Sequence, residues 1–244
     1  MGTGADEDNL VSLSGDPIWI HDKPSSFQAP EGEMCLEEIS AHIARHLGPV
    51  ETVFHELVSD TMHIDVHVVL PSRESACVRL VTSGMSDLPM TIPDHLSAPR
   101  HAELMISLPP DWKLDQASFE SGEWYWPVRL LKSLARLPHK YATWLDVGHT
   151  VPNGDPAVPY ASNTRLCGAI IAPPISSDDD FDTLRIDDDK EIRFYSVVPI
   201  YQAEMDLKLR KGAGALFERL GAKHVTDLVA ITRPDVTKKL FGVF

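Results

Sequence analysis

Four apolar segments follow one another in the first half of the chain with no helical pattern between them. They span residues 53–58, 62–70, 77–83 and 102–108. In the second segment apolar and polar side chains alternate, with Ile64, Val66 and Val68 set against His63, Asp65 and His67. This period of two is typical of a strand with one face in the core. Because successive strands without intervening helices favour antiparallel pairing, the sequence predicts an α+β fold with a mixed, mainly antiparallel sheet.

Three helices are expected to pack against this sheet. Apolar residues recur at helical spacing over residues 33–47, 126–137 and 204–220. The second helix is predicted to begin at Trp126-Pro127 and to end at Pro138, and Gly212 is predicted to interrupt the third. Further strands are predicted at 165–172, 183–186 and 192–199, and residues 144–161 read as a long ordered loop.

The chain shows no clean interdomain linker, so a single domain is expected over residues 33–244. Residues 1–32 are acidic at first and then rich in proline and serine, which predicts a flexible or loosely attached N-terminal segment. Within it, the apolar patch Ile18-Trp19-Ile20 is a candidate anchor to the body of the protein.

The net charge of -14 argues against two classes of partner, nucleic acid and anionic membrane surfaces. It is compatible with a basic protein partner. The three cysteines, Cys35, Cys77 and Cys167, are widely spaced and read as reduced, packed thiols. With no secretory signal and no long apolar run in the sequence, a cytoplasmic location is expected.

The most specific chemical interpretation of the strand at residues 62–70 is a metal site. His63, Asp65 and His67 share one face, and His55 and Glu56 on the neighbouring segment could add ligands. However, strand residues two apart lie about 7 Å apart at Cα, so such ligands rarely converge on one ion. A solvated face, or one covered by the 144–161 loop, is the favoured interpretation, and no metal is predicted.

No cofactor or catalytic signature is complete. The sequence lacks a P-loop, a GxGxxG motif and a GxSxG nucleophile elbow. His149 lies in a glycine-flanked loop and is the best general-base candidate, with Ser86 or Cys167 as a conceivable nucleophile. A small metal-dependent or His-based hydrolase therefore stays open as the alternative function, while no cofactor is expected.

Several long motifs, in order along the chain, resemble the suppressor of fused family in its bacterial single-domain form. They are HELVSD, HIDVHVV, LVTSGMSDLPM, AELMISLPPDWKL, WPVRLLKSLARLPH, TWLDVGHTVPNG and EMDLKLRKGAGALFERL. The similarity runs from about residue 36 to residue 234. It implies a non-enzymatic domain that binds protein, in animals by clamping a peptide that adds as a strand. Family context suggests an immunity protein, and an acidic surface suits a basic toxin.

The candidate protein-binding site consists of two loops. One loop comprises Ser83, Gly84, Met85, Ser86 and Asp87, and the other carries His149. We expect both loops to lie beside each other at one end of the sheet. The alternative is that Gly84 and Gly148 only provide backbone freedom for tight turns.

Overall fold

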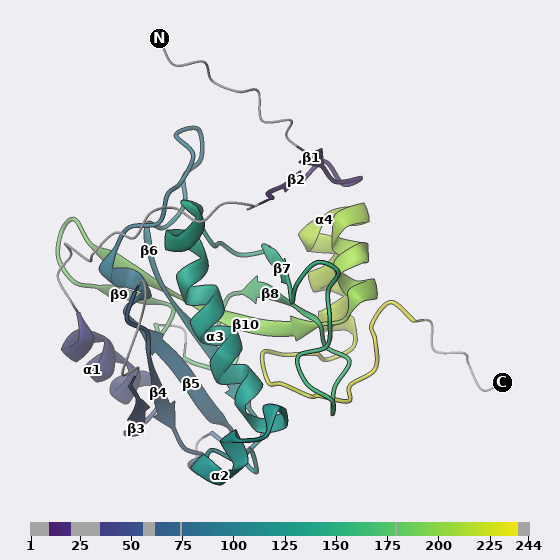
Figure 1. Ribbon diagram of the computed structural model, residues 1–244. Coiled ribbons are helices and arrows are strands. Elements are labelled where there is room, and N and C mark those ends of the chain that lie inside the picture. Colours follow the sequence, from purple (N-terminus) through teal and green to yellow (C-terminus); the bar gives the residue numbers. More distant parts are fainter. Residues whose placement is uncertain (1–9, 21–34, 56–61, 74, 179, 239–244) are drawn as a thin grey trace.

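The computed structural model describes residues 10–20, 35–55, 62–73, 75–178 and 180–238. This part of the chain forms one eight-stranded sheet and a separate small hairpin (Figure 1). The strands of the large sheet are β3 (Val50–Phe54), β4 (Asp65–Val69), β5 (Val78–Ser83), β6 (His101–Leu108), β7 (Thr150–Pro152), β8 (Gly168–Ala172), β9 (Thr183–Arg185) and β10 (Glu191–Ile200). Their order is β3-β4-β5-β6-β10-β8-β7, with β9 also paired to β10.

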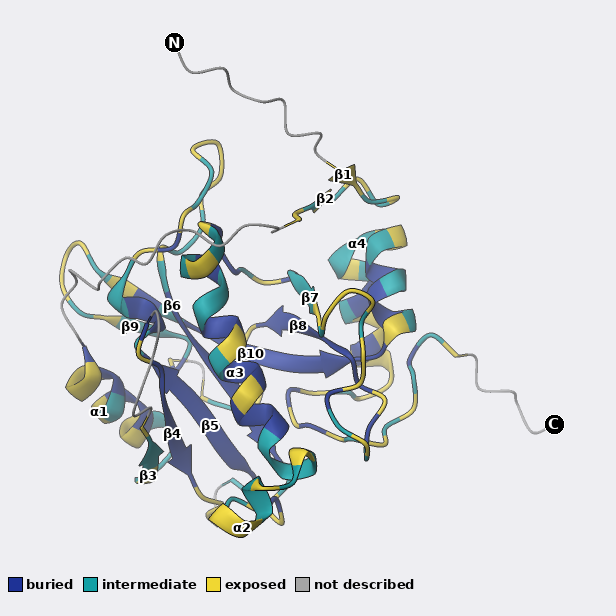
Figure 2. Ribbon diagram, viewed as in Figure 1, coloured by how far each residue is buried: buried dark blue, intermediate teal, exposed yellow. Residues whose placement is uncertain are grey.

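The predicted α+β class with a mixed, mainly antiparallel sheet is confirmed. Named strands pair in parallel only between β6 and β10, and every other strand pair among the described residues is antiparallel. The hairpin pairs β1 (Leu10–Val11) with β2 (Pro17–Ile18). The central strands are buried on both faces (Figure 2).

Helices cover the two faces of the sheet. They are α1 (Leu36–His46), α2 (Gln116–Phe119), α3 (Gly122–Tyr141) and α4 (Gln202–Ala222), with a 3-10 turn, η1, at Met85–Asp87. On one face, α3 packs across β4, β5 and β6 (Figure 1), and Leu131, Leu134 and Leu80 belong to the largest apolar cluster. The opposite face is shared, because α1 and α4 each build a separate cluster there.

The sheet forks between β6 and β10. These strands pair as far as Ser196 beside Met105, after which β10 continues along β8 alone. The C-terminal segment enters the opening, where Leu228 bridges to Ser107. The carboxylate of Asp227 accepts bonds there from the amides of Ile175 and Ser176 and from the hydroxyls of Ser176 and Ser196, at 3.0 to 3.3 Å. A buried carboxylate therefore holds the fork together.

The predicted ends of the second helix were wrong. The helix begins four residues before Trp126, because the hydroxyl of Ser121 accepts a bond from the amide of Glu123 and caps it. Both Pro127 and Pro138 lie inside the helix. Each removes one backbone donor, but both rings are buried, so apolar packing offsets that loss.

The polar face of the 62–70 strand was also misread. Of the three polar side chains on this face, Asp65 and His67 are buried and His63 is exposed. The buried part of the face lies on the side of the sheet that α1 covers. His67 is buried with its Nε2 at 2.9 Å from the hydroxyl of Ser83. The turn predicted at residues 59–61 lies outside the described residues.

Two further features concern the later part of the chain. The segment predicted as a loop over residues 144–161 contains β7, paired with β8. The predicted interruption of the last helix is confirmed, since Gly212 has non-helical angles, φ 84° and ψ 165°. No helix in the described part of the chain has the length and apolar character needed to cross a membrane.

Candidate functional site

The strand β7 ends the sheet on one side, and among the described residues it pairs with β8 alone. Two backbone hydrogen bonds flank its pairing with β8. The carbonyl of His149 accepts from the amide of Ile171 (2.9 Å), and the amide of Asn153 donates to the carbonyl of Cys167 (2.8 Å). Partners alternate along an antiparallel ladder, so residues 149, 151 and 153 turn their backbone groups to β8. The N–H and C=O of Thr150 therefore point away from the sheet, as at any edge open to pairing.

A groove runs between this edge and α3. It has a volume of about 150 Å³, and its residues are Arg129, Leu130, Ser133, Leu134, Leu137, Val151, Pro152, Asn153 and Tyr160. Both apolar and polar side chains line it. The guanidinium of Arg129 donates to the backbone oxygen of Tyr160 (2.8 Å) and fixes one end of the groove.

A tight turn, residues 146–149, leads into β7. Asp146 Oδ1 accepts from the hydroxyl of Tyr195 (3.0 Å) and from the amide of Val147 (2.8 Å). Gly148 has φ 89°, and a Cβ there would lie 2.9 Å from the Cβ of Ala213 in α4. Glycine is therefore required both by the turn and by the close approach of α4.

A second hollow, of about 190 Å³, opens on the other side of this turn. It is lined by Pro99, Asp146, Val147, Pro173, Pro174, Asp182, Arg193, Phe194 and Tyr195. Asp182 is paired with the guanidinium of Arg193 (2.8 Å), and the side chain of Val147 is 43% exposed. The hollow thus combines carboxylates with apolar walls at the same end of the sheet as the turn.

The imidazole of His149 is part of an aromatic contact and not of a catalytic pair. It packs edge-on against Trp144, with ring centroids 5.2 Å apart. Burial lowers the pKa of His149, and the nearby carboxylate of Asp146 opposes that shift. The backbone of Cys167 pairs with residue 153, four residues along the strand from His149, or about 13 Å at the usual rise. Its buried thiol has a raised pKa, which disfavours the reactive thiolate.

The loop Ser83–Asp87 and His149 both face the same end of the sheet. β5 and β8 run toward this end, and β6, β10 and β7 run away from it. β8 stops short of that end, because its last residue, Ala172, pairs with Ser196 in the middle of β10. Three strands, β6, β10 and β8, separate the two segments. Ser83, Met85 and Ser86 are buried and Gly84 and Asp87 are partly exposed. Gly84 has φ 107°, and a Cβ there would overlap the carbonyl of His63.

Buried ionisable groups hold the Ser83–Asp87 loop. The carboxylate of Glu103 accepts from the hydroxyl of Thr82 (2.6 Å) and from the amide and hydroxyl of Ser86 (2.9 and 2.7 Å). Burial raises the pKa of Glu103 to about 7, against the effect of these hydrogen bonds. Burial also raises the pKa of Asp87 to about 6. Ser86 is thus engaged by Glu103 and three strands away from His149, so a Ser86/His149 pair is not assembled.

Two histidines complete the support of this loop. His139 Nε2 lies 2.9 Å from the backbone oxygen of Met85, and His101 Nδ1 lies 2.9 Å from that of Ser86, so each ring donates a bond. Sequence reasoning missed Glu103. The available signal was its charge within AELMISL, a strand that is otherwise apolar.

The carboxylate of Asp65 contacts two histidines. Asp65 lies 2.8 Å from His55 Nδ1 and 3.2 Å from His63 Nε2. Searched over the described residues alone, the structure contains no group of three His, Cys, Asp or Glu side chains placed to hold a metal ion.

Comparison with known proteins connects this geometry to a family. Residues 60–234 match the model of a family described as suppressor of fused protein (SUFU). No curated protein matches the sequence.

Solved structures show the same fold. A SUFU homolog from Neisseria gonorrhoeae is 16% identical with a TM-score of 0.62, over 84% of this chain and 97% of that one. The Sufu–Fu complex is 12% identical with a TM-score of 0.58, over 84% of this chain and 93% of that one. Drosophila Suppressor of Fused is 12% identical with a TM-score of 0.51, over 77% of this chain and 46% of that one. This chain therefore spans about half of the Drosophila protein.

Proposed function

Because this chain belongs to the suppressor of fused family, we propose that it is a non-enzymatic domain that binds a protein partner at the outer edge of β7. One of the similar structures is a complex of Sufu with Fu, so that relative binds another protein. The observation that carries the proposal for this chain is the outward-facing backbone of Thr150, which lies beside the groove along α3.

An extended segment of the partner fits this geometry. It would add to β7 as a further strand and bond to the outward N–H and C=O of Thr150. Side chains on a strand alternate between its two faces. Every second side chain of the partner would then face the groove lined by Leu130, Leu134 and Val151, which supplies selectivity.

The proposed surface includes both segments singled out in the sequence. His149 directly precedes the edge strand and is a direct contact of the partner. In the Ser83–Asp87 loop, Asp87 is the acidic residue that a partner can reach, because its side chain is only partly buried. Ser83, Met85 and Ser86 fix the shape of the loop from within, and Gly84 permits its turn.

We further propose that the partner is basic, such as a bacterial toxin, and that the protein acts as an immunity protein. The net charge of -14 supports this, because charge complementarity accelerates encounter. The test is a competition assay against cells that deliver a toxin encoded beside this gene. Expression of the wild-type chain should protect, and a chain with a blocked β7 edge should not.

Blocking the edge also tests the proposal directly. A library of random ten-residue peptides is displayed on phage and selected on the full chain. Thr150→Pro removes the outward N–H without removing a bond to β8, and proline is tolerated at such edge positions. We expect the selected peptides to lose at least tenfold in affinity for Thr150→Pro.

The matched control is Thr150→Ala, which loses the same side chain but keeps the N–H. It should bind the selected peptides as the wild type does. If no peptide is selected, or if the proline variant binds as well as the alanine variant, binding by strand addition at β7 is wrong.

A further inference from the structure

A short N-terminal hairpin covers the start of the proposed edge. The indole of Trp19, directly after β2, packs edge-on against Trp144, with centroids 5.3 Å apart and an interplanar angle of 74°. Trp144 in turn packs edge-on against His149 at 5.2 Å and 69°. Three aromatic rings therefore run in series from the hairpin to the residue that precedes β7.

The tip of the hairpin is held by the break in α4. At Gly212 the helix is interrupted, so carbonyls in the preceding turn lack their usual helical partners. The amide of Ser14 donates to the carbonyl of Leu209 (3.0 Å), and its hydroxyl donates to that of Lys208 (3.4 Å). Asp16 lies 3.5 Å from the ammonium of Lys208. The hairpin is thus attached at its tip and at one ring.

Apolar packing adds little to this attachment. The buried core clusters of the described chain begin at Cys35 and include no residue of the hairpin. The apolar side chains of Leu10, Val11, Leu13, Trp19 and Ile20 remain 39% to 86% exposed. A two-stranded hairpin without a packed face is marginal in water. Its ring can therefore leave Trp144 without disrupting the core.

We propose that Trp144 and His149 form a docking site for a single indole ring, occupied by Trp19 in the free protein and by a tryptophan of the partner in the complex. The site is continuous with the β7 edge, because His149 is the residue directly before that strand. This inference rests on the proposed function only for the identity of the second occupant. The chemistry follows from the edge-to-face arrangement, which favours an aromatic occupant over an aliphatic one.

The site is tested with the hairpin itself as a probe. A synthetic peptide of residues 10–20 is titrated by NMR into the full wild-type chain and into the full-length double variant Ser14→Ala/Trp19→Ala. The double variant removes the indole ring and the hydroxyl contact of the tip, while the amide bond from Ser14 to Leu209 stays. We expect the peptide to bind the double variant at least tenfold more tightly than the wild type, with shifts at Trp144 and His149. A peptide carrying Trp19→Ala should bind neither chain.

The control chain is Ile20→Ala, which alters the neighbouring exposed side chain and should behave as the wild type. Thermal unfolding of each variant checks that the fold is intact. Equal binding of the peptide to wild type and double variant, or no binding to the double variant, would overturn the docking site. This outcome does not depend on Thr150→Pro, so the two proposals can fail separately.

The binding of a tryptophan of the partner in place of Trp19 is tested by a separate measurement. Peptides selected from the random library on the double variant should carry tryptophan at one fixed position more often than those selected on the wild type, where Trp19 competes. Selection of strand-adding peptides without any aromatic preference would keep the β7 proposal and remove the exchange.

Discussion

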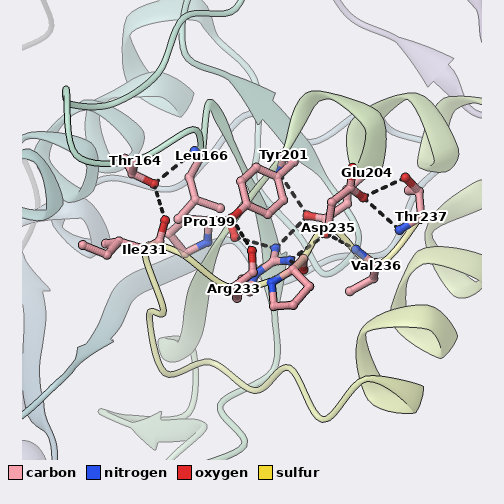
Figure 3. A network of polar contacts seen from close by, with 11 residues as sticks. Thr164, Leu166, Pro199, Tyr201, Glu204, Ile231, Arg233, Asp235, Val236 and Thr237 are labelled. Atoms are coloured by element: carbon pink, nitrogen blue, oxygen red, sulfur yellow. Dashed lines mark hydrogen bonds and ion pairs between the residues drawn. The ribbon is translucent and has the colours of Figure 1, made fainter. Parts of the chain in front are cut away.

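The two ends of the described chain are both fastened to α4 by a carboxylate and a cation, yet in opposite ways. At the C-terminal end, Arg233 donates to both oxygens of Glu204 at 2.6 Å (Figure 3), and the two side chains are 7% and 0% exposed. At the N-terminal end, Asp16 lies 3.5 Å from Lys208 and is 39% exposed. One pair is buried and bidentate; the other is long and partly hydrated.

The C-terminal pair is also embedded in further bonds. Glu204 accepts from the amides of Tyr201 and Val236, both at 2.9 Å, and the hydroxyl of Tyr201 donates to the carbonyl of Arg233 (Figure 3). A buried pair of this kind is costly to break, because the remaining charge is left without a partner. The difference indicates that the C-terminal segment is a permanent part of the fold, whereas the N-terminal hairpin can leave its site and be replaced by a partner.

Arg233→Ala should have the largest effect. It leaves Glu204 buried and unpaired, so we expect the free energy of unfolding in urea to fall by about 3–5 kcal/mol. The double variant Glu204→Leu/Arg233→Met removes both charges and should lose clearly less. If the single variant loses no more than the double, the buried pair does not fix the C-terminal segment.

The contribution of Glu103 to stability should depend on pH. Glu103 is buried like Glu204, but no cation is among its hydrogen-bond partners in the described chain. Its pKa is raised from the ordinary 4.5 to about 7. The stability that this shift contributes is fully present below pH 4.5 and is lost as the pH rises through 7. The contribution is on the order of 3 kcal/mol. Glu103→Gln cannot ionise and should flatten this dependence; an unchanged slope in urea unfolding from pH 5 to 8 would contradict the assignment.

Asp227→Ala should have the third-largest effect on the free energy of unfolding. The substitution leaves the amides of Ile175 and Ser176 and the hydroxyl of Ser196 without their acceptor in the fork of the sheet. We expect a loss of about 2–3 kcal/mol, measured by thermal unfolding. The matched control is Asp235→Ala, because among the described contacts the side chain of Asp235 accepts hydrogen bonds only from nearby Thr237; it should change stability by less than about 1 kcal/mol.

Trp19→Ala should have a small effect for so large a side chain. The ring makes one edge-on contact and stays partly exposed, so about 1 kcal/mol is expected. Trp126→Ala is the contrast, since that ring is fully buried in the main core and its loss should cost about 3–5 kcal/mol. Comparable losses for the two variants would mean that the hairpin is as firmly packed as the core.

Asp16→Asn should have the smallest effect, about 0.5 kcal/mol in urea unfolding, because a partly exposed ion pair is screened by water and salt. Added salt should reduce even this difference. A loss near that of Arg233→Ala would remove the distinction between the two chain ends.

The sequence predicts those parts of the fold that have a local signature. The strand at β4, the apolar run of β6 and the break at Gly212 are each visible within a few residues and are confirmed. By contrast, β7 has three residues between a glycine turn and a proline-rich stretch, and it is a strand only because β8 pairs with it. The side on which α1 packs is likewise decided by tertiary contacts, so the buried position of His67 was not predictable.

In the candidate site, too, only the features with a local sequence signature could be predicted. His149 could be singled out because it sits in an unusual glycine-flanked loop. Its contact with Trp144, and that of Trp144 with Trp19, joins residues far apart in sequence. The groove along α3 likewise needs the helix and β7 to be placed first.

The parallel seam between β6 and β10 has a consequence for the order of folding. The strands β3 to β6 pair with sequence neighbours, and so do β7 with β8 and β9 with β10. The seam instead brings together His101 and Ile192, and closing so long a loop carries a large entropic cost. We expect two antiparallel half-sheets to form early and to dock late along β6 and β10. In pulse-labelling hydrogen exchange the amides of this seam should gain protection last; early protection there would contradict that order.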